Sequence, residues 1–248
     1  HASPLFQFPL GVAERHIGNQ QTSDHFAKQR TINGTWQQCA QTEHWLNHRR
    51  GVPPKPILVC RNTISRPYLD GRLNDEVWQR ARRVELVSFQ NDDSNWPAMA
   101  MLSYDAHYLY LGITCRKANG CHYPKAEGTR HYDAKLANHD HVELLIDVDR
   151  DYSTYYRLAL DHRGWTTDTC WKNPNWNPTW YVASDHNELS WSVEIAIPFD
   201  ELVQHAPTPD VAWALGIQRT VPGVGFQSWS RPASVEGIPE GMGGLLFD

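Results

Sequence analysis

The sequence contains no apolar run long enough to cross a membrane. A transmembrane helix needs about 18–20 consecutive apolar residues, whereas no window here approaches that length and the mean hydropathy is -0.59. We therefore expect neither an integral membrane protein nor a membrane partner. Cysteine is also sparse, with five in 248 residues. Because no two cysteines form a CxxC pair, a tetrathiolate zinc site is not expected, whereas Cys115 and Cys121 flank a turn that could close a short disulfide loop.

Signatures of several enzyme classes are missing as well. The chain has no GxSxG nucleophile elbow, no glycine-rich phosphate loop and no dinucleotide-binding fingerprint. The net charge of -5 is unevenly spread: residues 1–62 carry seven Lys and Arg against three Asp and Glu, which leaves 16 against 25 for the rest. An acidic main part disfavours nucleic acid as a partner.

Aromatic residues and histidines, in contrast, are abundant. The chain has 11 Trp, 10 Tyr and 13 His, and flat apolar rings suit recognition while imidazoles suit metal binding. The first residue is His1, with no apolar leader before it. This start predicts a mature exported protein, secreted or periplasmic, or a domain cut from a longer chain.

The first 65 residues predict an irregular extension that contains one helix. They are rich in Gln, Asn and His and are interrupted by prolines. The one helix is expected over about residues 35–50, where Thr35 would cap the first turn, Gln38 would complete a capping box and Gly51 would end the helix. On this helix His44 and His48 share one face, as transition-metal ligands often do.

From residue 66 to 248 the pattern changes to short alternating or β-branched runs that are separated by turn residues. This pattern predicts an all-β domain, an antiparallel β-sandwich of immunoglobulin or jelly-roll type. The expected strands cover residues 98–104, 108–115, 141–147, 155–160, 165–171, 189–197, 211–220 and 244–247.

Several segments of this part match a known family in order. They are Tyr68-Leu69-Asp70-Gly71-Arg72-Leu73-Asn74-Asp75-Glu76-Val77-Trp78, Tyr104-Asp105 with Tyr108-Leu109-Tyr110, Asp140-His141-Val142-Glu143-Leu144-Leu145-Ile146-Asp147, Tyr156-Arg157-Leu158, Trp191-Ser192-Val193-Glu194-Ile195-Ala196-Ile197-Pro198 and Gly243-Gly244-Leu245. Over roughly residues 66–248 the chain therefore resembles the family 9 carbohydrate-binding modules. Residues 1–65 lie outside this resemblance.

The resemblance implies a non-catalytic β-sandwich that binds sugars and carries structural calcium. Glu143 and Arg157 match polar positions that contact sugar hydroxyls, and charge-assisted hydrogen bonds suit that task. A structural ion pair between neighbouring strands is the alternative interpretation. The family's two sugar-sandwiching tryptophans are absent, because their positions fall near Ala137 and near Glu236.

A relocated aromatic platform is expected in the segment 171–180. Trp171, Trp176 and Trp180 lie there beside Asn175, and Pro174 and Pro178 would stiffen the loop so that the indoles face outward. Asn175 would then meet sugar hydroxyls. The alternative is that these tryptophans fill the core or close one end of the sandwich.

Two metal sites are candidates. Asp147, Asp149 and Asp151 stand at alternate positions before a turn, an arrangement of hard oxygen ligands that suits Ca²⁺. A solvated acidic hairpin tip would have the same sequence pattern and is the alternative interpretation. The amine and imidazole of His1, with a second His, would form a copper site that resembles the histidine brace of copper monooxygenases. Alternatively, His1 marks only the place where the chain was cut.

Three hypotheses follow. The first is a secreted, non-catalytic module of a larger glycan-acting protein that binds a polysaccharide or oligosaccharide through tryptophan stacking with Glu143 and Arg157. The second is a copper oxidoreductase with its metal at His1. The third is a structural or docking domain without a ligand, which residues 1–65 attach to a neighbouring domain of the parent protein.

Overall fold

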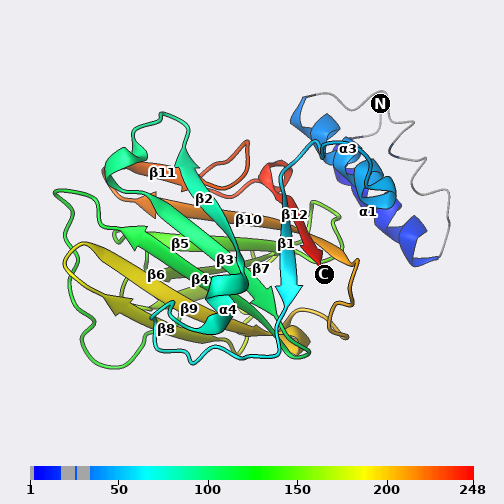
Figure 1. Ribbon diagram of the computed structural model, residues 1–248. Helices are drawn as coiled ribbons and strands as arrows, with labels where there is room; N and C mark the ends of the chain where they lie inside the picture. Colours follow the sequence, from blue (N-terminus) through cyan, green and yellow to red (C-terminus); the bar gives the residue numbers. More distant parts are fainter. Residues whose placement is uncertain (1–2, 18–25, 27–33) are drawn as a thin grey trace.

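Two helices, α1 (Pro4–His16) and α3 (Thr35–His48), lie to one side of a β-rich body (Figure 1). The computed structural model describes residues 3–17, 26 and 34–248. Its longer helices are α1 and α3, and the short α4 (Glu76–Arg80) lies against the strands. None of the described helices is long and apolar enough to span a membrane.

The strands form two layers that share a continuous pairing path. Their bounds are β1 (Ile57–Asn62), β2 (Arg82–Ser88), β3 (Ala98–Tyr104), β4 (Tyr108–Arg116), β5 (His141–Asp147), β6 (Tyr156–Asp161), β7 (Thr166–Cys170), β8 (Tyr181–His186), β9 (Ser190–Pro198), β10 (Ala212–Val221), β11 (Gly225–Ser228) and β12 (Gly243–Phe247). The path runs β7-β6-β5-β10-β11-β2-β3-β4-β9-β8, and β12 pairs with β10 and β1. The predicted antiparallel β-sandwich is confirmed.

Strand alternation builds the main core between the layers. On β5 the side chains of Val142, Leu144 and Ile146 enter this core, whereas Glu143 stands between them in sequence and belongs to the opposite face. The eight predicted strands all form, each within one residue of the expected bounds. β2, β8 and β11 were not predicted, because their polar, half-exposed or very short runs lack an apolar alternation.

The turn that opens the family-like part of the chain is held by one buried carboxylate. Oε2 of Glu194 accepts the backbone N–H groups of Asp70 and Gly71, each at 2.9 Å, and Oε1 accepts the indole N–H of Trp78 at 2.7 Å. Gly71 has φ of 83°, and a Cβ there would lie 2.4 Å from the backbone nitrogen of Asp185. Only glycine fits this turn without displacing β8.

The N-terminal part is more regular than predicted. α1 forms although Pro9 lies inside it, and β1 pairs in parallel with β12 and β3, although it precedes the boundary expected at residue 66. The predicted helix at 35–50 is present, but the capping prediction was wrong. Gly34, with φ of 64°, precedes the first turn, and no side chain caps it. At the other end Arg49 adopts the left-handed conformation, before Gly51 is reached.

A buried carboxylate on α3 attaches the helices to the sandwich. Glu43, 2% exposed, accepts from Arg15 of α1 at 2.9 Å and from Nε of Arg150 at 3.0 and 3.1 Å. The hydroxyl of Tyr152 donates to it at 3.3 Å. Around this group, a second apolar cluster joins the helices to the outer face of the β5–β10 layer; its buried members are Phe8, Phe26, Cys39, Ala40, Leu145, Tyr152, Ala214 and Met242.

We expect Glu43→Gln to lower the free energy of unfolding by about 3 kcal/mol, because it leaves Arg15 and Arg150 without their shared carboxylate in a buried setting. Urea denaturation followed by circular dichroism measures this change. Glu188→Gln, at an exposed position, is the matched control. A loss below about 1 kcal/mol, the value of an exposed ion pair, would contradict a structural role for Glu43.

Candidate functional site

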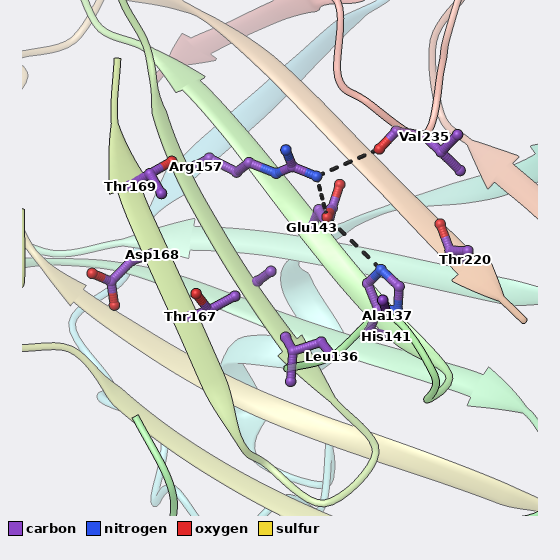
Figure 2. Close-up of a pocket in the computed structure, with 11 residues that line it drawn as sticks. Leu136, Ala137, His141, Glu143, Arg157, Thr167, Asp168, Thr169, Thr220 and Val235 are labelled. Carbon is purple, nitrogen blue, oxygen red and sulfur yellow. Dashed lines mark hydrogen bonds and ion pairs between the residues drawn. The ribbon is translucent and has the colours of Figure 1, made fainter. Parts of the chain in front are cut away.

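A cavity of about 400 Å³ opens on the outer face of β5, β6, β7 and β10 (Figure 2). We call it the Glu143 cavity. Its wall consists of Leu136, Ala137, His141, Glu143, Arg157, Ala159, Thr167, Asp168, Thr169, Thr220 and Val235. Four neighbouring strands and two loops thus contribute to one concave surface.

Strand register brings the polar side chains of the cavity together. Glu143 of β5 stands opposite Ala159 of β6 on one side and Gln218 of β10 on the other. Arg157 and Ala159 in turn stand opposite Thr169 and Thr167 of β7. Residues paired across adjacent strands share a face, so the carboxylate, the guanidinium and the threonine hydroxyls gather on the face away from the core.

Glu143 is the centre of a hydrogen-bond network, and it is 6% exposed. Its Oε1 accepts from the guanidinium of Arg157, and its Oε2 accepts from the amide of Gln218 at 2.6 Å. The guanidinium also reaches the carbonyl of Val235 at 3.4 Å, and Nε2 of His141 lies 3.8 Å from Oε1 (Figure 2). The structure therefore brings Glu143 and Arg157 together as an ion pair. Gln218 of β10, which also donates to Glu143, was not predicted.

This network suits the binding of a neutral polyhydroxylated ligand. Arg157 offers N–H donors, Glu143 offers acceptor lone pairs, and Thr167 and Thr169 supply hydroxyls that do either. The ion pair has no net charge, so it presents fixed hydrogen-bonding groups without a strong field. Asp140, the other acid of this motif, points away into the core, where it pairs with Arg219.

The positions of the two missing tryptophans both lie at this cavity. Ala137 lines it, and in the second loop Val235 lines it while the carbonyl of Glu236 lies 3.5 Å from Arg157. No indole therefore stands at either position. The described residues that line the cavity offer hydrogen-bonding groups and no ring of Trp, Tyr or Phe.

The predicted tryptophan platform is only partly formed. The prediction that Trp180 faces outward was wrong: it is 2% exposed, and its indole N–H donates to Asp168 at 3.2 Å in the core. Trp176 packs on Tyr156, with ring centroids 4.8 Å apart. Trp171, which follows the last residue of β7, is 67% exposed. Asn175, in the same segment, is also exposed.

The three aspartates of the predicted calcium site do meet. One carboxylate oxygen from each of Asp147, Asp149 and Asp151 lies within 4.8 Å of the other two. Asp147 is fully buried rather than part of a solvated tip. Burial, reinforced by Asp149 and Asp151, raises the pKa of the Asp147 carboxyl well above its usual range. A bound cation would relieve that repulsion, so these residues fit a hard cation such as Ca²⁺.

Two other sequence-based ideas have different outcomes. His1 lies outside the described residues, so the copper hypothesis stays a prediction. The five cysteines are all unpaired thiols. Cys115 is in the main core, whereas Cys121 packs against a separate cluster around Trp96, so they do not close a disulfide loop.

Comparison with known proteins identifies similar domains. A family model described as "Carbohydrate family 9 binding domain-like" matches residues 69–223. A carbohydrate-binding module of family 9 from Caldicellulosiruptor kristjanssonii, solved with glucose, aligns with a TM-score of 0.58 at 12% identity over 78% of this chain and 96% of that one. The same organism's module with cellotriose gives 0.57 at 12% identity over 78% and 94%.

A third solved structure agrees in fold. A putative carbohydrate-binding protein from Bacteroides uniformis ATCC 8492 aligns with a TM-score of 0.58 at 14% identity, covering 78% of this chain and 100% of that one. No curated protein matches the chain.

Trp171 and Trp180, at the two ends of the segment 171–180, should contribute differently to the stability of the protein. We expect Trp180→Ala to cost about 3–5 kcal/mol, because it empties a filled core position, and Trp171→Ala to change the free energy of unfolding by no more than about 0.5 kcal/mol. Chemical denaturation of both variants measures this difference. Equal losses in the two would contradict the assignment of Trp180 to the core and Trp171 to the surface.

Proposed function

Since this chain belongs to the carbohydrate family 9 binding domain-like family, we propose that it binds a carbohydrate without catalysis, and that the ligand occupies the Glu143 cavity. The observation that supports this site most directly is the meeting of Glu143, Arg157 and the two family tryptophan positions in one cavity. The Caldicellulosiruptor modules of similar fold were solved with glucose and with cellotriose.

Hydrogen bonding explains how the cavity would hold a sugar. Arg157 donates to a ring or hydroxyl oxygen, while Glu143 accepts from a hydroxyl hydrogen, and each such charge-assisted bond is among the stronger kinds. The volume lies in the range of small-ligand sites. Trp171 directly follows β7, donates its backbone N–H to the carbonyl of Tyr155 and is exposed.

The wider setting is also part of the proposal. The ligand would be a polysaccharide or an oligosaccharide, and the domain would act outside the cell or in the periplasm as the binding module of a larger glycan-acting protein. The acidic loop 147–151 would hold Ca²⁺ through Asp147, Asp149 and Asp151, with the ion stabilising the loop that contacts α3 through Arg150.

Arg157→Met should weaken glycan binding about tenfold or more, because it removes hydrogen bonds to a charged group worth about 1.5–3 kcal/mol. Affinity electrophoresis through gels with a panel of plant, algal and host polysaccharides identifies the ligand and measures the change. Arg80→Met is the matched control, since Arg80 forms an exposed ion pair with Glu76 on α4.

Thr169→Val provides a second test that keeps the buried charges paired. It should reduce retardation while the melting temperature stays the same. If the wild-type chain migrates equally in every gel, carbohydrate binding is wrong; if it is retarded and both cavity variants match it, the ligand binds elsewhere.

Calcium should raise the melting temperature at pH 7 by roughly 5–10 °C when it is present at about 100 times its Kd. The gain should shrink at pH 4.5. Burial raises the pKa of Asp147 in the folded, metal-free protein. The free energy of unfolding of that protein is therefore higher when Asp147 is protonated, and it falls as the pH rises through this pKa. Calcium offsets the loss at neutral pH.

Differential scanning calorimetry with Ca²⁺ or a chelator measures this effect. Asp149→Asn should abolish the gain, and Asp200→Asn, at an exposed position, should preserve it. A calcium gain that is the same in Asp149→Asn as in the wild type would show that the ion binds at another place.

A further inference from the structure

Two irregular segments meet beside the Glu143 cavity, and a group of potential metal ligands lies where they meet. Residues 117–140, which connect β4 to β5, contain neither helix nor strand and carry His139 near their end. Asp161 is the last residue of β6, and His162 follows it in the turn toward β7. The backbone N–H of His162 donates to the carbonyl of Asp140 at 3.2 Å, and the imidazoles of His139 and His162 lie 5.9 Å apart.

His162 has an orphaned buried nitrogen. The residue is 2% exposed, and its Nε2 lies 3.0 Å from the carbonyl oxygen of Pro124. A carbonyl oxygen only accepts, so Nε2 carries the proton and Nδ1 of the neutral ring bears a lone pair. Nδ1 has no hydrogen-bond partner among the described residues. A buried acceptor without a partner costs about 1–3 kcal/mol, which calls for an explanation.

This arrangement is the one that metal-binding histidines adopt. Such a histidine binds the ion through one ring nitrogen and donates its other N–H to a carboxylate or backbone carbonyl, which fixes the tautomer. The contact with Pro124 already supplies that carbonyl.

The geometry of the neighbours completes a ligand set. One ligand atom from each of His139, Asp161 and His162 lies within 4.8 Å of the other two. We propose that these three residues form a transition-metal site that binds Zn²⁺ with water in the fourth position. Two imidazoles and one carboxylate favour zinc over calcium, which prefers oxygen ligands alone.

Arg163 competes with the ion for Asp161. Its Nε and Nη2 donate to Oδ2 of Asp161 at 2.9 and 2.6 Å, and the backbone N–H groups of Arg163 and Trp165 donate to Oδ1 at 2.9 and 3.2 Å. Zinc therefore binds by displacing the guanidinium from Oδ2. The guanidinium already lies 3.6 Å from the ring of Trp165, where a cation–π contact retains it after displacement.

The proposed site is independent of sugar binding, but it adjoins the same wall. Leu136 and Ala137 line the Glu143 cavity a few residues before His139. Zinc would thus tie the long β4–β5 connection to the β6–β7 turn and hold that wall in place. No catalytic step is assigned to the ion.

Zinc binding by the metal-free full chain tests the proposal, measured by competition with a chromophoric zinc chelator in excess Ca²⁺. The excess Ca²⁺ keeps zinc from binding to the acidic loop 147–151, the calcium site proposed above. We expect one zinc per wild-type chain, at least tenfold weaker binding in His139→Ala, and tighter binding in Arg163→Met. His48→Ala is the control, because His44 and His48, with ring centroids 4.4 Å apart, are another candidate pair.

His139 is only half-buried, so its variant should fold, and near-ultraviolet circular dichroism checks this. Nitrogen NMR of the imidazoles is the second measurement: zinc should shift the Nδ1 resonance of His162. A wild-type chain that binds no zinc overturns the proposal, as does a His139→Ala variant that binds it equally well. So does an Nδ1 resonance that stays unchanged while zinc is bound.

Discussion

The two layers of this domain depend on a buried ion pair between Arg219 and Asp140. Arg219 is fully buried on β10, and its Nε and Nη2 donate to both oxygens of Asp140 at 2.9 and 2.6 Å. The same guanidinium donates to the carbonyls of Trp96 and Arg116 in the opposite layer, at 2.8 and 2.7 Å. Removing either charge would leave the other in the interior without an opposite charge to balance it. Because Asp140 directly precedes β5, the pair also fixes the strand that carries Glu143.

The site uses the opposite face of the strands that form the core. Val142 and Leu144 close the interior on one side of β5, and Glu143 reaches the cavity on the other. A binding surface on paired strands is rigid, so its hydrogen-bonding groups are held in place before a ligand arrives. The loops around it supply Ala137 and Val235, whose small side chains complete the wall of the cavity.

Much of the fold could be predicted from the sequence, and less of the site. Apolar alternation gave the bounds of β5 correctly, and the family-like motif pointed to Glu143 and Arg157, which do meet. Thr169 and Gln218 could not be found this way, since strand neighbours depend on the whole topology. Trp180 was misplaced because a proline-rich segment has no periodicity that separates inward from outward. α1 was missed because a proline within a helix is normally a strong contrary signal.

The parallel pairing of β1 with β12 has a mechanical consequence. Ile57 to Cys60 stand alongside Gly244 to Phe247, and the backbone N–H of Asp248 donates to Cys60. Tension that draws the start of β1 and the end of β12 apart acts along both strands, so it shears all their hydrogen bonds together instead of opening them one by one. Load transmitted through the chain would therefore meet its resistance at this seam, while the cavity on the β5–β7 strands lies outside the direct path of the force.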